Sequence, residues 1–415
     1  MRKLLTFFVI LQLSAAFALE IFPAGKKYIY RIGEDIIFKV KLDKENPERK
    51  IKVRIAGNSV PDKEFTIEAD KNGDAEIRTV NSVPGFVYVE ISNGGKKRQE
   101  GVAVEPEKII AGRPFPEKFD TYWDAAKKEL DLMPLTYQIS ELPKPRQGYR
   151  ALEVKVDMGG EGKDLFAVLT MPTGLHHGRL AAEVVYHGAG TDKVFPIYRE
   201  NTIVLSVNPM SVKHDGPPSS TIRKGKFRGY PRWGAADLQK NYFPGMFRRV
   251  FRALQFIKSL PEWDHRTLIV RGISQGGGQA LVAAGLDPQV TLCIAAVPAL
   301  CDHGGNLVGR VSGWPRYYTT TDYKNSPDKA AEALDMIDAV FFAAKIKNAK
   351  VLVTVGFIDR VCVGDSVYAA YNAIPSPDKQ IANDFMTGHT TSRETKNLIN
   401  KLIIDHISKK HEIFK

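Results

Sequence analysis

The chain has 415 residues, of which 43% are hydrophobic, and its formal net charge is +12. This length exceeds what one domain usually holds, so two domains are expected. Residues 20–105 carry 16 basic and 15 acidic side chains, so the excess of positive charge lies almost entirely after residue 105. Three cysteines cannot all pair internally, and no Cys/His cluster has metal spacing, so we expect buried thiols, no disulfide framework, no metal and no cofactor.

The first 18 residues have the pattern of a secretory signal peptide. Arg2 and Lys3 precede an apolar run from Leu4 to Leu13, and Ala16-Phe17-Ala18 supplies the small-x-small cleavage pattern. The run is too short to span a bilayer, and no second long apolar stretch follows it. We therefore expect an exported protein, periplasmic or secreted, with no integral membrane segment. Export argues against nucleic acid as a partner, and the basic cluster at residues 223–228 is interpreted as a solvated loop.

Residues 19–105 are predicted to form a small all-β domain. Short segments of alternating hydrophobicity recur along this stretch, and Asn72-Gly73 between two of them predicts a tight hairpin. Six short strands over this length favour an immunoglobulin-like sandwich. The expected strands are Ile36–Leu42, Ile51–Ile55, Phe65–Ala69, Ala75–Val80, Phe86–Ile91 and Val102–Val104.

From residue 106 to residue 415 the pattern changes to that of an α/β domain. Apolar residues at helical spacing predict a helix from Phe119 to Leu130, and Leu152–Val156 and Phe166–Met171 alternate as an antiparallel pair. Strands and helices then alternate, which predicts a mostly parallel sheet with helices on both faces. A further helix carries an apolar stripe from Phe247 to Ile257.

Two segments of this domain carry candidate substrate contacts. The strand Glu183–Tyr186 is followed by His187-Gly188-Ala189, and a His-Gly pair leaving a strand is typical of the loop that donates a backbone N–H to an oxyanion in esterases. An ordinary glycine turn is the alternative. Further on, a long loop between Met210 and Gly245 contains Tyr230 and Trp233. Their rings could line a sugar site or clamp the loop to the core.

The most informative motif follows the helix that ends at Ile257. An apolar strand, Thr267–Val270, leads into Gly272-Ile273-Ser274-Gln275-Gly276 and then into helix-compatible residues. This is the strand–turn–helix context of a nucleophile elbow, in which only small residues let strand and helix pass each other. We predict Ser274 as the nucleophile and the N–H groups of Gln275 and Ala189 as the oxyanion donors. The alternative is that Ser274 is only a small residue in a glycine-rich turn.

Two possible partners of this serine follow in the order that α/β-hydrolases use. Asp359 lies three residues past the buried strand Lys350–Gly356, and His389 comes directly after a short strand at Gln380–Met386. A neutral imidazole can take the serine proton, and a carboxylate on its far nitrogen fixes the tautomer. We predict a Ser274–His389–Asp359 triad, with Asp365 as the rival acid.

Four stretches of this part resemble the acetyl xylan esterase / cephalosporin-C deacetylase family of α/β-hydrolases, over roughly residues 108 to 405. They are Arg113-Pro114 through Trp123, Phe247–Val270 with the Gly-x-Ser-Gln-Gly motif, Val297–Asp302 with a Pro-x-Leu-Cys-Asp pattern, and Asp359–Cys362 with Tyr368–Asn372. The resemblance implies a metal-independent serine esterase that acts on acetylated carbohydrate. The resemblance also implies that Cys301 and Cys362 belong to the family's sequence pattern and are not disulfide partners.

The chain departs from the family pattern at three places. Asn208-Pro209-Met210 replaces the usual Arg-Gly-Gln, Thr390 follows His389 in place of Glu, and Ala189 replaces a tyrosine associated with a narrow acyl pocket. We therefore interpret the chain as a divergent, exported member with an added β domain, and we leave homo-oligomer formation open. The rival hypotheses are another hydrolase activity on the same fold, such as a peptidase or a different carbohydrate esterase, and an inactive glycan-binding protein.

Overall fold

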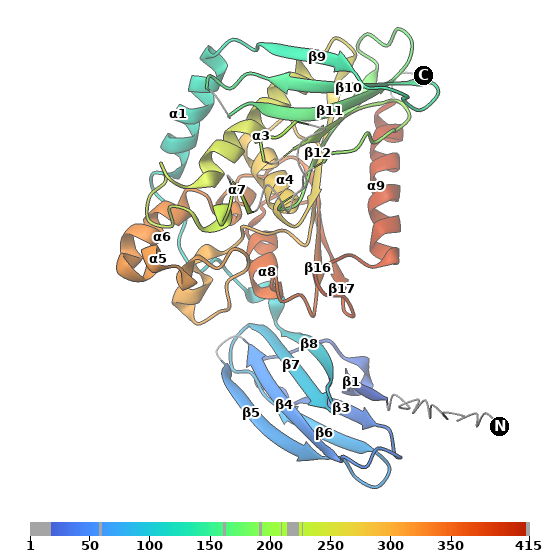
Figure 1. The fold of residues 1–415 in the computed structure, drawn as a ribbon, viewed down its shortest axis with the longest axis vertical. Helices are drawn as coiled ribbons and strands as arrows, with labels where there is room; N and C mark the ends of the chain where they lie inside the picture. The colour runs from blue at the N-terminus through green and yellow to red at the C-terminus, as the bar shows by residue number, and fades with distance from the viewer. Residues whose placement is uncertain are drawn as a thin grey trace, which may run out of the picture.

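A computed structural model describes residues 18–57, 60–160, 163–190, 193–208, 210–213, 224–225 and 227–411. The predicted signal peptide lies outside the described residues apart from Ala18, so its role stays a prediction. The described chain forms two units, an all-β unit at residues 19–104 (the β unit) and a larger α/β unit after it (Figure 1). Within the described ranges, no helix is long and apolar enough to cross a membrane.

The β unit consists of two sheets that pack their apolar faces together. Side chains of Ile36, Phe38 and Val40 alternate with more exposed residues along one strand and point into the shared core. A three-stranded sheet has the order β1-β3-β6, and a five-stranded sheet has the order β2-β8-β7-β4-β5. The strands are β1 (Leu19–Pro23), β2 (Ile29–Tyr30), β3 (Ile36–Leu42), β4 (Lys50–Gly57), β5 (Val60–Glu68), β6 (Asp74–Thr79), β7 (Gly85–Asn93) and β8 (Lys96–Val104).

The predicted all-β architecture is confirmed, but the prediction of a hairpin at Asn72-Gly73 is wrong. β5 and β6 lie in different sheets, and β6 pairs with β3 instead. The turn carries the chain from the five-stranded sheet to the three-stranded sheet. Within the turn, the Asp70 carboxylate accepts the N–H groups of Asn72 (2.8 Å) and Asp74 (2.9 Å). Gly73 has φ +87°, and a Cβ there would lie 1.9 Å from the carbonyl oxygen of Leu42, so glycine is required for a reason other than a hairpin.

The α/β unit is built on a nine-stranded sheet with the order β17-β16-β15-β14-β12-β13-β11-β10-β9. The six strands from β17 to β13 are parallel, and β11, β10 and β9 continue the sheet in antiparallel pairs. The strands are β9 (Tyr137–Glu141), β10 (Tyr149–Val156), β11 (Leu165–Pro172), β12 (Leu180–Tyr186), β13 (Thr202–Val207), β14 (Trp263–Ile273), β15 (Leu292–Ala296), β16 (Lys350–Gly356) and β17 (Lys379–Asp384).

Helices cover both faces of this sheet, as the alternation of strands and helices predicts. Along β15, Leu292 and Ile294 face the C-terminal helix, whereas Cys293 and Ala295 face the opposite layer. This alternation explains why the parallel strands are apolar at nearly every position. The α-helices are α1 (Phe119–Leu132), α3 (Tyr242–Lys258), α4 (Gln275–Leu286), α5 (Thr321–Asn325), α6 (Pro327–Asp335), α7 (Ala339–Ala343), α8 (Gly364–Ala373) and α9 (Arg393–His411). The three cysteines are buried and unpaired, as expected.

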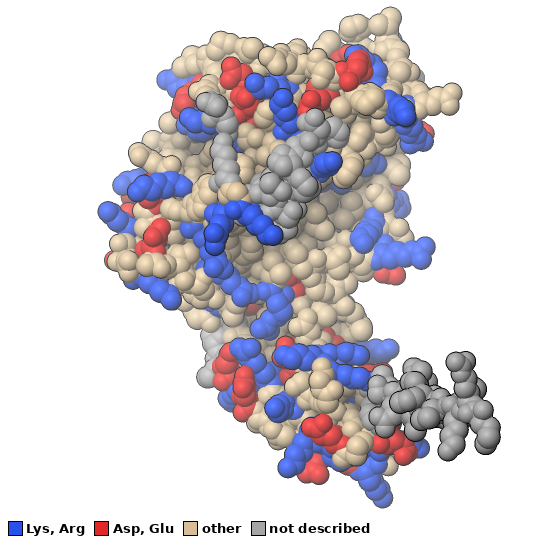
Figure 2. Space-filling model, in the orientation of Figure 1, with Lys and Arg blue, Asp and Glu red and all other residues tan. Residues whose placement is uncertain are grey.

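Surface charge differs between the two units. In Figure 2 acidic and basic side chains are mixed over the β unit, whereas basic side chains run along the middle of the visible face of the α/β unit. This matches the sequence, in which the basic excess lies after residue 105.

A buried charge cluster ties the central strands together. The Glu183 side chain on β12 is fully buried and forms ion pairs with Arg199, before β13, and with Arg271 on β14. Burial alone would raise the pKa of Glu183, but the two guanidinium groups outweigh it and hold the pKa below its usual value. The cluster thereby fixes the neighbouring strands whose ends carry the predicted site.

Glu183→Gln removes the charge that compensates these arginines, so it is expected to lower the free energy of unfolding by about 3 kcal/mol. Because the folded-state pKa is lowered, this stabilisation is present above the unfolded pKa, and it is lost as the pH falls through the folded value. Urea unfolding at neutral pH measures the difference. Glu129→Gln, which breaks the more exposed pair with Arg248, is the matched control and should cost less than about 1 kcal/mol.

Candidate active site

The turn at Ser274 joins β14 to α4 through a very close backbone approach. Ser274 has φ 59° and ψ −124°, a strained conformation for a residue with a side chain. A Cβ at Gly272 would lie 2.3 Å from the backbone of Gly276, and a Cβ at Gly276 would lie 2.1 Å from the carbonyl oxygen of Tyr186. Both glycines are therefore required, and the strand–turn–helix geometry that the sequence predicts for this motif is confirmed.

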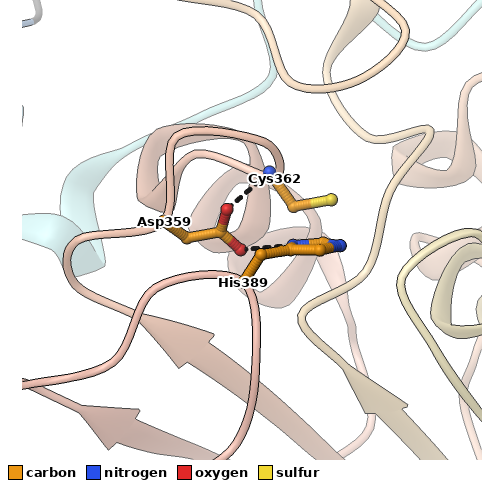
Figure 3. A group of neighbouring side chains, drawn as sticks. All are labelled: Asp359, Cys362 and His389. Carbon is orange, nitrogen blue, oxygen red and sulfur yellow. Dashed lines mark hydrogen bonds and ion pairs between the residues drawn. The ribbon is translucent and has the colours of Figure 1, made fainter.

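The structure brings Ser274, His389 and Asp359 together in one chain of hydrogen bonds. His389 Nε2 lies 2.9 Å from Ser274 Oγ, and His389 Nδ1 lies 2.8 Å from Asp359 Oδ2 (Figure 3 shows the last two residues). When Nδ1 donates to the carboxylate, Nε2 carries the lone pair that can accept the serine proton. The three residues come from the ends of β14, β16 and β17, where the carboxyl ends of parallel strands meet.

The Asp359 carboxylate is completely buried and its charge is held by backbone donors. Its Oδ1 accepts the N–H groups of Val361 (2.7 Å) and Cys362 (3.0 Å), and its Oδ2 faces the imidazole. Asp365, the rival acid, lies elsewhere: its carboxylate accepts the N–H of Phe86 at 3.1 Å, and burial raises its pKa to about 7. The structure therefore places Asp359, and not Asp365, on His389.

One predicted oxyanion donor, Gln275, follows the nucleophile in the chain, and the other, Ala189, follows a glycine that lies close to it. Gln275 is the first residue of α4, where backbone N–H groups have no acceptor within the helix. The loop after β12 passes close to Ser274, because a Cβ at Gly188 would lie 3.9 Å from the Ser274 Cβ atom. Gln279 Nε2 donates to the carbonyl of His187 at 3.1 Å and so anchors this loop to α4. The role of Gln275 and Ala189 as donors stays a prediction.

Tyr230 and Trp233 occupy different environments. Tyr230 is only 2% exposed, and its hydroxyl donates to Gln275 Oε1 at 2.7 Å. Its ring therefore supports the residue after the nucleophile and does not offer an open face to a sugar. Trp233 is 36% exposed and donates its indole N–H to the carbonyl of Arg228 at 3.0 Å, so a substrate contact by Trp233 stays a prediction.

Cys362 is a neighbour of the triad that residue-by-residue reasoning missed, because a single cysteine in an apolar loop gives no signal of its own. Burial raises the pKa of its thiol well above the usual value, while a hydrogen bond with Ser274 acts in the opposite direction. In Figure 3 the Cys362 side chain points the same way as the imidazole ring of His389. A neutral thiol therefore lies beside the nucleophile.

Ligand atoms of Asp359, Cys362 and His389 lie within 4.8 Å of one another, a spacing that could hold a metal ion. In this arrangement both carboxylate oxygens and His389 Nδ1 already form hydrogen bonds. A metal would have to displace these bonds, so the donor set fits a proton-transfer chain better than a metal site.

Comparisons with known proteins relate most of the chain to one family. The model of the acetyl xylan esterase family matches residues 107–400. The acetyl esterase Axe7A of Xylanibacter ruminicola is 29% identical over an alignment of 343 residues, and the match covers 78% of this chain and 75% of that protein. The acetyl xylan esterase of Paenibacillus sp. R4 superposes with a TM-score of 0.62 at 24% identity, over 72% of this chain and 98% of its own. Acetyl xylan esterase 1 of a Thermoanaerobacterium species gives a TM-score of 0.60 at 23% identity, over 73% and 98%.

The superpositions show the α/β-hydrolase fold and so confirm the predicted fold class. The family model covers more than half of the chain, including all the residues of the hydrogen-bonded chain. This protein is therefore a carboxylic ester hydrolase that belongs to the acetyl xylan esterase family.

Proposed function

We propose that this protein is a serine esterase that removes acetyl groups from carbohydrates such as xylan or xylo-oligosaccharides. The observation that carries the proposal is the unbroken chain of hydrogen bonds from Ser274 through His389 to the buried Asp359. Family membership supports a carbohydrate acetyl ester as the substrate. An inactive glycan-binding protein would have no need for a buried charge and a strained serine, which both cost folding free energy.

In the proposed mechanism, Ser274 Oγ attacks the ester carbonyl carbon while His389 Nε2 takes its proton. The N–H groups of Gln275 and Ala189 receive the negative charge that develops on the carbonyl oxygen. The C–O bond to the sugar then breaks, and His389 returns the proton to the leaving sugar oxygen. Water then attacks the acetyl-enzyme while the same imidazole takes its proton; the acyl bond to Ser274 Oγ breaks, and the imidazole returns that proton to Ser274 Oγ as acetate leaves. Asp359 stays ionised and holds the imidazole in one orientation.

The nucleophile is tested with a fluorophosphonate, which reacts with activated serines. The wild type should be labelled at Ser274 alone and should release acetate from acetylated xylan. Ser274→Ala should lose both the labelling and the acetate release while keeping its melting temperature. Labelling that persists in the variant, or a wild type that releases no acetate from any acetylated glycan, would overturn the proposal.

The triad acid is tested by a pair of isosteric substitutions. Asp359→Asn should keep the fold and lower kcat by about 10⁴-fold, because the imidazole loses the tautomer that accepts the serine proton. Asp365→Asn is the matched control, since this carboxyl is equally buried but contacts the backbone of Phe86 and not His389, and the amide oxygen of asparagine can still accept the Phe86 N–H. Its kcat should stay close to that of the wild type. A reversed pair of effects would mean that the acid is misassigned.

Ala189 is expected to widen the acyl pocket. It is exposed, and it follows Gly188, which lies against the nucleophile. A pocket gains only about 0.8 kcal/mol for each methylene that it buries, so kcat/KM for p-nitrophenyl butyrate should be within a few-fold of that for the acetate ester. Ala189→Tyr should restore a preference for acetate by steric exclusion. Sharp rejection of butyrate by the wild type would show that another residue closes the pocket.

A further inference from the structure

The β unit contacts both loops that carry the partners of Ser274. These loops are residues 357–363 after β16, which include Asp359 (the acid loop), and residues 385–392 after β17, which include His389 (the base loop). In Figure 1 the β unit lies beyond the carboxyl ends of β16 and β17, next to α8, with β8 among its nearest strands. The family model begins at residue 107, so every strand of the β unit lies outside the matched residues.

Contacts between the β unit and the acid loop are direct. A Cβ at Gly101 on β8 would lie 2.1 Å from the carbonyl oxygen of Phe357, so the two backbones touch. The Phe86 ring on β7 meets the Phe357 ring at a centroid distance of 5.0 Å. The Arg360 guanidinium lies 4.6 Å from the centre of the Tyr88 ring. The residues on either side of Asp359 are therefore packed against the β unit.

The start of α8, directly after the acid loop, is also held by the β unit. The N–H of Gly364 donates to the Tyr88 hydroxyl at 3.1 Å, and the N–H of Phe86 donates to the buried Asp365 carboxylate. A Cβ at Gly364 would lie 2.4 Å from the Phe86 ring. The acid loop is thus fixed at its beginning through Phe357 and at its end through Gly364.

Contacts with the base loop depend on Tyr28, which precedes β2. Its ring stacks on Phe385 with a centroid distance of 4.6 Å and an interplanar angle of 18°, and its hydroxyl lies 3.5 Å from Met386 Sδ. The same ring meets Phe357 edge-on at 6.4 Å, so Tyr28 touches both loops. The carbonyl of Tyr28 accepts the N–H of Ala103 on β8 at 2.9 Å, which ties the residue to the β unit.

The two loops are also joined to each other beneath these contacts. The N–H of Ile358 donates to the carbonyl of Thr387 at 3.1 Å, and a Cβ at Gly356 would lie 2.2 Å from the carbonyl oxygen of Gly388. The Phe357 and Phe385 rings meet at 4.7 Å. The packing of the two loops against each other and against the β unit therefore sets the position of Asp359 relative to His389.

We propose that the β unit sets the position of Asp359 relative to His389 through its contacts with the acid loop and the base loop, with the aromatic ring of Tyr28 as the principal positioning group. This inference rests on the proposed triad. It gives the β unit a role in the rate of the chemical step, whereas a glycan-binding module would act on substrate affinity. A triad tolerates little misplacement, since about 1 Å of error can cost on the order of 10²-fold in rate.

The test uses three variants of the full-length protein with p-nitrophenyl acetate as substrate. Tyr28→Ala removes the stacking on Phe385, whereas Tyr28→Phe keeps the stacking and loses only the contact with Met386. Phe65→Ala is a control that removes a half-exposed aromatic ring on β5, the edge strand of the five-stranded sheet that lies farthest from β2. Tyr28 is only partly buried, so its variants should fold. The kcat values are expressed per folded protein, with the folded fraction of each variant taken from its urea unfolding curve, which corrects for any unfolded fraction.

Tyr28→Ala should lower kcat by on the order of 10- to 100-fold with KM changed less than about two-fold, whereas Tyr28→Phe and Phe65→Ala should behave like the wild type. In an Asp359→Asn background, most of the effect of Tyr28→Ala should disappear, because residues that act through one catalytic unit are not additive. A purely structural residue would give the same factor in both backgrounds.

Each of three results would overturn the inference. They are an unchanged kcat in Tyr28→Ala, an effect on KM alone, and an undiminished effect in the Asp359→Asn background. A wild type that does not hydrolyse the ester would instead overturn the proposed function, and the inference with it.

Discussion

The active site depends on one close approach, in which the turn between β14 and α4 lies against the end of β12 with no side chain between them. Gly272 and Gly276 make this approach possible, because a Cβ at either position would overlap backbone atoms. Three consequences follow. Ser274 is forced into a strained conformation, and its hydroxyl lies within hydrogen-bond distance of His389. The loop after β12 lies beside Ser274. The folding free energy of the large sheet compensates for this strain.

The buried carboxylate of Asp359 imposes the second constraint. An unpaired charge in this environment would be very unfavourable, so the acid loop must turn back and supply backbone N–H donors while His389 supplies the third. Because these donors come from two loops, the geometry of their hydrogen bonds to Asp359 depends on the packing that holds the two loops in place. In this chain part of that packing comes from residues that precede the family's matched region.

Much of the fold and of the candidate site could be predicted from the sequence. The alternation of strands and helices, the glycine spacing around Ser274 and the order of the possible triad residues are local or ordered signals, and the structure places those residues in contact. Asn72-Gly73 misled because a turn motif specifies the bend but not the sheet that its second strand joins. β1 and β2 were missed since each is short and its partner is distant in sequence. The contacts of Tyr28 with Phe385 and of Phe86 with Phe357 join residues hundreds of positions apart, and no local pattern reveals them.

The fit of Gly364 against the Phe86 ring has a consequence for how such an enzyme could arise. A catalytic domain with any larger residue at this position would clash with the incoming ring, so joining a β unit to the amino terminus of a relative would not by itself reproduce this interface. The recipient would first need a glycine at the start of α8 and apolar rings at the positions of Phe357 and Tyr368. The two units of the present chain therefore fit each other at Gly364, and a larger side chain on either surface would require a change on the other.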